Sequence, residues 1–121
     1  MTLNRLQWVG VLAAPLTWAA QHVVGFGVTQ AECNVGGMRW GIQNNVWQLS
    51  MLVVGGTIVI GAEVAAAIVF RRTRNIGHDD PPPDGRLHFL ATAALVANVL
   101  FLSVMLLDGI ASNLTSLCRG A

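Results

Sequence analysis

The stretch LSMLVVGGTIVIGAEVAAAIVF, from Leu49 to Phe70, is almost entirely apolar and contains one charged residue, Glu63. Two further apolar runs, Val9–Val28 and Leu87–Leu107, have a similar length. Each run is close to the roughly 20 residues that a helix needs to cross the hydrocarbon core of a bilayer. Because backbone polar groups inside a membrane must be satisfied within the segment, the runs predict transmembrane helices.

The composition leaves little room for a soluble domain, since 54% of the 121 residues are hydrophobic and 11% are charged. We therefore predict an all-α integral membrane protein with a single domain of three transmembrane helices, at about residues 7–28, 48–70 and 87–107. An outer loop, 29–47, and a proline-rich loop, 71–86, would connect them. The first run resembles a signal peptide, but it continues past Ala20 to Val28, which favours a transmembrane helix.

The arginines predict the orientation of the helices. Two of the seven, Arg39 and Arg119, fall on one side of the predicted membrane, and five fall on the other: Arg5, Arg71, Arg72, Arg74 and Arg86. The positive-inside rule then places the N-terminus and the 71–86 loop in the cytoplasm, and the 29–47 loop and the C-terminus outside. This predicts a multi-pass protein of the bacterial cytoplasmic membrane. The net charge of +1 gives no reason to expect nucleic-acid binding.

The two cysteines, Cys33 and Cys118, both fall on the predicted outer side, a few residues beyond helix ends. An oxidising compartment permits disulfides, so we expect the two residues to be joined. The alternative is a pair of unrelated thiols, because two cysteines alone supply too few ligands for a zinc site.

Three tryptophans suit the membrane interfaces, where aromatic side chains are enriched. We expect Trp8 at the inner interface, and Trp40 and Trp47 at the outer one.

Glu63 is the only acid within a predicted span, and ionisable groups at such positions are often functional. Thr57, Gly61 and Ala65 recur at every fourth position and form a ridge of small residues that would let another helix approach closely. We expect this ridge to meet the other two helices, with Glu63 on the opposite face. Glu63 would then bond to a partner helix; proton relay and snorkelling to the interface are alternatives.

The remaining polar residues suggest contacts between helices. His22, beside Gln21, lies in the outer half of the first span, where we expect it to bond to Ser103. Asn98 lies near the midplane and suits a polar clasp with Thr17 and Thr57.

His88, at the inner mouth of the third span, is separated from His22 by roughly 20 Å of depth. Bis-histidine haem ligation needs two imidazoles at one depth, so a haem could only be shared with a partner subunit. The sequence contains no nucleophile–base pair, glycine-rich phosphate loop or CxxC motif. We therefore expect no catalytic residue, no metal site and no cofactor of its own, but we expect bound lipids.

Several short motifs resemble those of a known group of proteins. The first span contains Ala14-Pro15-Leu16-Thr17-Trp18 followed by Gln21-His22, and the third ends in Asp108-Gly109-Ile110 before a terminal cysteine. The chain resembles small three-span membrane proteins found with bacterial haem-copper cytochrome c oxidases. This resemblance implies an accessory subunit or an assembly companion, and it implies no catalytic residues.

The leading hypothesis is thus an accessory membrane subunit of a bacterial respiratory complex, a cytochrome c oxidase above all, which acts in assembly or stability by packing against larger membrane subunits. One alternative is a haem- or quinone-binding electron-transfer subunit that shares its site, through His22 or His88, with a partner. The other is a small channel or holin-like oligomer lined by Glu63 and Asn98.

Overall fold

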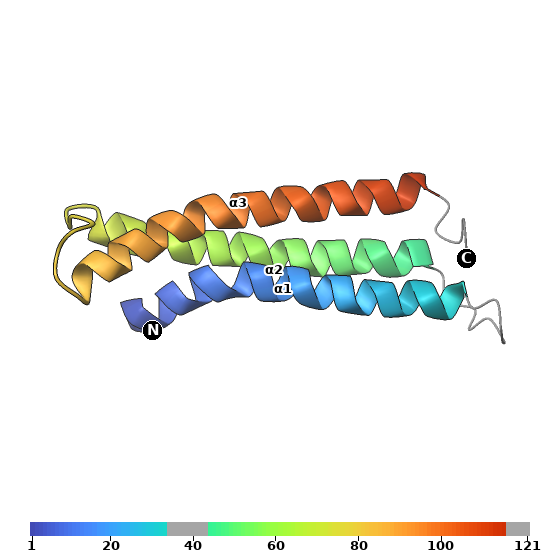
Figure 1. The fold of residues 1–121 in the computed structure, drawn as a ribbon, viewed down its shortest axis with the longest axis horizontal. Helices are drawn as coiled ribbons and strands as arrows, with labels where there is room; N and C mark the ends of the chain where they lie inside the picture. The colour runs from blue at the N-terminus through green and yellow to red at the C-terminus, as the bar shows by residue number, and fades with distance from the viewer. Residues whose placement is uncertain (34–43, 116–121) are drawn as a thin grey trace.

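The computed structural model describes residues 1–33 and 44–115, which fold into three antiparallel α-helices side by side (Figure 1). They are α1 (Leu3–Glu32), α2 (Asn44–Thr73) and α3 (Asp84–Leu114). We call the end of the bundle where α2 ends and α3 begins the arginine end, and the opposite end, near Cys33, the cysteine end. The fold is therefore all-α, as predicted.

Each helix is long and apolar enough to cross a membrane. Large apolar side chains point away from the bundle along its length; Leu16, Phe26, Val96 and Leu107, for example, are each more than 60% exposed. The core is narrow and centres on Ala14, Val59 and Met105. Small residues inside and large apolar residues outside are the pattern expected of helices that pack within lipid.

The helices extend beyond the predicted boundaries at both ends. α1 begins at Leu3, where the Thr2 side chain accepts a bond from the Arg5 backbone N–H at 3.5 Å, and it runs on to Glu32. The proline-rich connection is correspondingly shorter, 74–83 rather than 71–86. The predicted boundaries followed the apolar runs, which are the parts that a bilayer could cover. Helical hydrogen bonding continues through the polar turns beyond them, so the helices are longer.

The small-residue ridge predicted on α2 is wrong. Thr57 and Gly61 are exposed, and of the three predicted residues only Ala65 is buried. The buried face instead carries Val59, Ala62, Ala66, Val69 and Thr73. Successive residues of this buried face, the seam of α2, are separated alternately by three and four positions. This is the seven-residue repeat of helices that pack in a bundle. Residues at every fourth position rotate progressively around the helix, so such a row does not stay on the seam.

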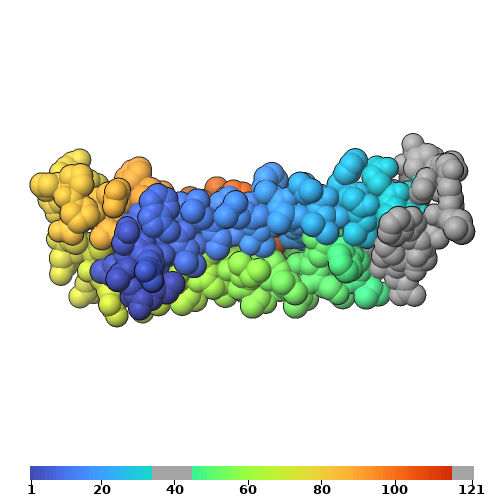
Figure 2. Space-filling model, turned by 90° about the horizontal axis from the view of Figure 1, so that it is seen from below, coloured from blue at the N-terminus to red at the C-terminus, as the bar shows by residue number. Residues whose placement is uncertain are grey.

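α1 and α2 lie close together at Gly10. A Cβ atom on Gly10 would lie 3.1 Å from the Ala66 backbone nitrogen and 3.2 Å from its Cβ. Figure 2 shows α1 lying directly along α2. Because the neighbouring atoms belong to backbone and to a short side chain, a larger residue at position 10 would push the two helices apart.

Candidate functional site

Polar side chains inside the bundle form separate clusters, and the first lies at the arginine end. His88 is 7% exposed, and its Nδ1 lies 3.0 Å from the Thr73 hydroxyl. That hydroxyl donates to the Val69 carbonyl at 2.8 Å, so His88 Nδ1 is the donor to Thr73. Phe70 stacks on the His88 ring at 5.2 Å.

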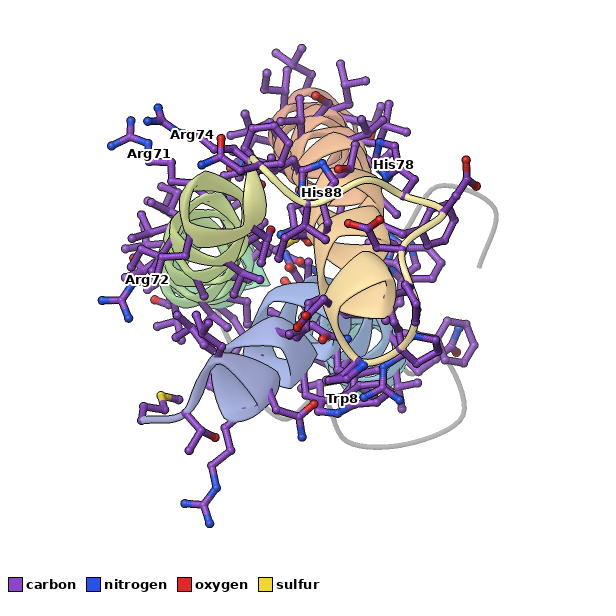
Figure 3. All side chains as sticks on the ribbon, turned by 90° about the vertical axis from the view of Figure 1, so that its left-hand side faces the viewer. Trp8, Arg71, Arg72, Arg74, His78 and His88 are labelled. Atoms are coloured by element: carbon purple, nitrogen blue, oxygen red, sulfur yellow. The ribbon has the colours of Figure 1, made fainter. Side chains whose placement is uncertain are left out.

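The 74–83 connection adds a second imidazole to this cluster. The His78 ring centroid lies 4.6 Å from that of His88 (Figure 3). The same view shows Arg71, Arg72 and Arg74 pointing outward around the end of α2. Sequence reasoning missed the contact of His88 with Thr73, although Thr73 continues the seam spacing from Val69.

The second cluster lies in the interior between the arginine end and the core. Asn98 is 1% exposed and donates from Nδ2 to the Gly10 carbonyl at 3.0 Å, while its Oδ1 has no partner. Gln7 is equally buried, and neither of its amide atoms has a partner. The predicted clasp of Asn98 with Thr17 and Thr57 is wrong, because Thr57 faces outward and bonds to the Val53 carbonyl.

Glu63 lies level with this second cluster. The facing pairs Thr73–His88 and Gly55–Met105 set the register of α2 against α3, and the same register puts Glu63 at the height of Asn98. Its side chain is partly exposed, yet its Oε2 is buried and has no hydrogen-bond partner. The described residues thus leave this carboxylate oxygen unsatisfied.

The third cluster lies toward the cysteine end. His22 Nε2 is 3.1 Å from Asp108 Oδ2, and both side chains are about half exposed. The Trp18 ring packs on His22 with a centroid distance of 4.6 Å. The predicted bond from His22 to Ser103 is wrong. Ser103 is exposed and bonds to the Val99 carbonyl of its own helix at 2.8 Å.

Gln21 lies on the inner side of α1 beside the His22–Asp108 contact. Its Oε1 is buried without a partner and would lie 3.0 Å from a Cβ atom added to Gly55. Trp8 and Trp47 lie near opposite ends of the bundle and are 45% and 41% exposed. Their role as interface anchors stays a prediction, and Trp40 lies outside the described residues.

Cys33 directly follows α1, and its backbone N–H bonds to the Thr29 carbonyl at 2.9 Å. Cys118 lies outside the described residues, so the disulfide stays a prediction. Non-reducing peptide mapping should find Cys33 linked to Cys118. Closing a loop of this length stabilises a chain by up to about 4–5 kcal/mol in the entropic model. Free thiols at both positions, in protein isolated with a thiol-blocking reagent, would disprove the link.

Few side chains in these clusters could serve as metal or haem ligands. Within residues 1–33 and 44–115, no group of three or more His, Cys, Asp or Glu side chains is arranged to hold a metal ion. His22 and His88 lie toward opposite ends of the bundle. His88 and Asp108, the partner of His22, are separated by about 30 Å along α3 at 1.5 Å per residue. One copy of this chain therefore cannot ligate a haem through both imidazoles.

No protein-family model, curated protein or solved structure matches this chain. The resemblance to oxidase-associated proteins therefore rests on the short motifs alone.

Proposed function

We propose that this chain is an accessory, non-catalytic subunit of a bacterial respiratory complex, of the cytochrome c oxidase kind, and that it acts in assembly and stability by helix packing. The observation that carries the proposal is the Glu63 carboxylate, which lies on an apolar helix, is partly exposed and has no hydrogen-bond partner among the described residues. An unpaired charge at this depth costs about 3 kcal/mol on membrane-insertion scales. A donor from a neighbouring subunit would remove that cost.

The surface of the bundle supports the same proposal. The seam of α2 is already covered by α1 and α3, whereas a Cβ atom added to Gly56 would meet nothing within 4 Å. Glu63 follows Gly56 by seven residues, or two helical turns, so both lie on the same face of α2. A further helix that contacts α2 here would find both a small residue and a hydrogen-bond acceptor. The choice of a cytochrome c oxidase as the type of complex comes from the resemblance of the short sequence motifs.

The alternatives receive less support. In the electron-transfer alternative, the two histidines lie toward opposite ends of the bundle, and the Nε2 of His22 already lies 3.1 Å from Asp108 Oδ2. A channel-forming oligomer lined by Glu63 and Asn98 would need both side chains on the surface of the bundle, whereas Asn98 is 1% exposed.

Purification of the tagged chain in mild detergent, followed by mass spectrometry of co-purifying chains, tests the proposed function. We expect larger membrane subunits in a fixed ratio to this chain.

The proposed orientation has the N-terminus in the cytoplasm and the C-terminus outside, because five arginines oppose two. A periplasm-active reporter fused after Ala121 should be active, and the same reporter inserted within residues 75–83 should be silent. The reverse pattern of activity would invert the topology.

A further inference from the structure

A cavity of about 270 Å³ opens at the cysteine end, beside the His22–Asp108 pair. All three helices line it. Its polar lining consists of Gln21, His22, Gln48, Asp108, Ser112 and Thr115.

Besides the side-chain amides of Gln21 and Gln48, this lining holds several unused hydrogen-bond acceptors. The Ser112 hydroxyl already donates to the Gly109 carbonyl at 3.0 Å, and the Thr115 hydroxyl donates to the Ala111 carbonyl at 2.8 Å. Their oxygens therefore keep lone pairs but have no free hydrogen. Gln21 Oε1 is a buried acceptor without a donor. Asp108 uses one oxygen on His22 and has a second one available.

A ligand that suits this lining must donate several hydrogen bonds and carry positive charge. A primary ammonium group has three N–H donors and no acceptor. Its bonds to a carboxylate are charge-assisted and hence stronger than those between neutral groups. A quaternary ammonium group has the same charge but no N–H, so it would leave these acceptors unsatisfied.

An apolar groove of about 370 Å³ lies between α1 and α2, next to the cavity. Gln21 lines both the groove and the cavity, so the two lie on either side of this residue. Apart from Gln21, Thr17 and Ser50, the groove is lined by apolar residues, among them Ala20, Val24 and Val54. An apolar channel beside an ammonium site suits a lipid better than a free amine.

We propose that the cavity binds the ammonium headgroup of a phospholipid with a primary amine, such as phosphatidylethanolamine, and that the groove holds one acyl chain. This proposal rests on the membrane location proposed above. The reporter fusions test that location separately, so failure of the lipid site can be distinguished from failure of the location.

The test is native mass spectrometry of the full-length chain in detergent, with phosphatidylethanolamine and phosphatidylcholine of identical acyl chains as competing probes. We expect the unchanged chain to retain phosphatidylethanolamine about tenfold more than phosphatidylcholine, since one charge-assisted bond to Asp108 is of that order. Asp108→Asn should abolish the preference. Asp79→Asn makes the same change at the opposite end of the bundle and should leave the preference unchanged.

A second variant tests the groove independently of the headgroup. Ala20→Trp places a large side chain in the groove from an exposed position, so retention of both lipids should fall. Equal retention of the two lipids by the unchanged chain, or a preference that survives Asp108→Asn, would overturn the proposal. Displacement of the lipid by an equimolar amount of free ethanolamine would also overturn it, by showing that the site binds amines rather than lipids.

Discussion

Gly10→Leu should destabilise the bundle by about 1–3 kcal/mol, the usual cost of forcing extra carbon atoms into a packed interface. The Cβ atom alone would lie 3.1 Å from the Ala66 backbone nitrogen, so α1 must move away from α2 to admit the rest of the side chain. This movement would also strain the bond from Asn98 to the Gly10 carbonyl. Thermal unfolding in detergent, followed by circular dichroism, measures the effect.

Gly27→Leu is the matched control for this substitution. Gly27 lies on the same helix, and a Cβ atom there would meet nothing within 4 Å. The intrinsic helix propensity changes by the same amount in both variants, favouring leucine by about 0.8 kcal/mol. We therefore expect Gly27→Leu to unfold at or slightly above the temperature of the unchanged chain. Equal midpoints for the two variants would contradict the close contact of α1 with α2.

Glu63→Leu should greatly reduce the amount of this chain retained in the proposed complex. Leucine fills a similar volume but cannot bond to a partner, so a donor on the neighbouring subunit would be left buried and unsatisfied. Such a loss is of the order of 1–3 kcal/mol, a factor of about 5 to 150 in affinity. The ratio of this chain to the larger subunits after purification measures it.

Glu63→Gln separates the packing role of Glu63 from proton transfer. The amide keeps the size of the side chain and an acceptor oxygen, so the chain should stay in the complex and turnover should continue. If a fully assembled complex with Glu63→Gln lost proton-coupled turnover, the packing role would be wrong and a proton relay would replace it.

The three apolar runs predicted the helices, because a membrane span needs length and hydrophobicity and both are visible in a sequence. Which face of each helix points toward the other two was harder to predict from the sequence. Gly61 belongs to the row of small residues at every fourth position, and Ala62 belongs to the buried row. Both rows contain small residues, and only the positions of the neighbouring helices decide which row is buried. Sequence reasoning therefore chose the wrong face of α2.

The boundaries of the helices explain why the contact of His22 with Asp108 was missed. With the third helix ending at Leu107, Asp108 counted as a loop residue, and Ser103 was the nearest polar side chain at a suitable height. α3 instead continues to Leu114, which places Asp108 on the helix beside His22. The bond of Asn98 to Gly10 could not be predicted for a different reason. Its acceptor is a backbone carbonyl, and no pattern of side chains in the sequence indicates such an acceptor.

Purification of the natively expressed, tagged chain in mild detergent tests whether it is a subunit of an oxidase complex. The eluate would be analysed for subunit stoichiometry by native mass spectrometry and for haem by its absorbance spectrum. We expect a fixed ratio of this chain to larger oxidase subunits, with haem that is absent when the chain is purified alone. A chain that elutes without larger subunits, or that alone carries stoichiometric haem lost on His22→Ala, would contradict this expectation.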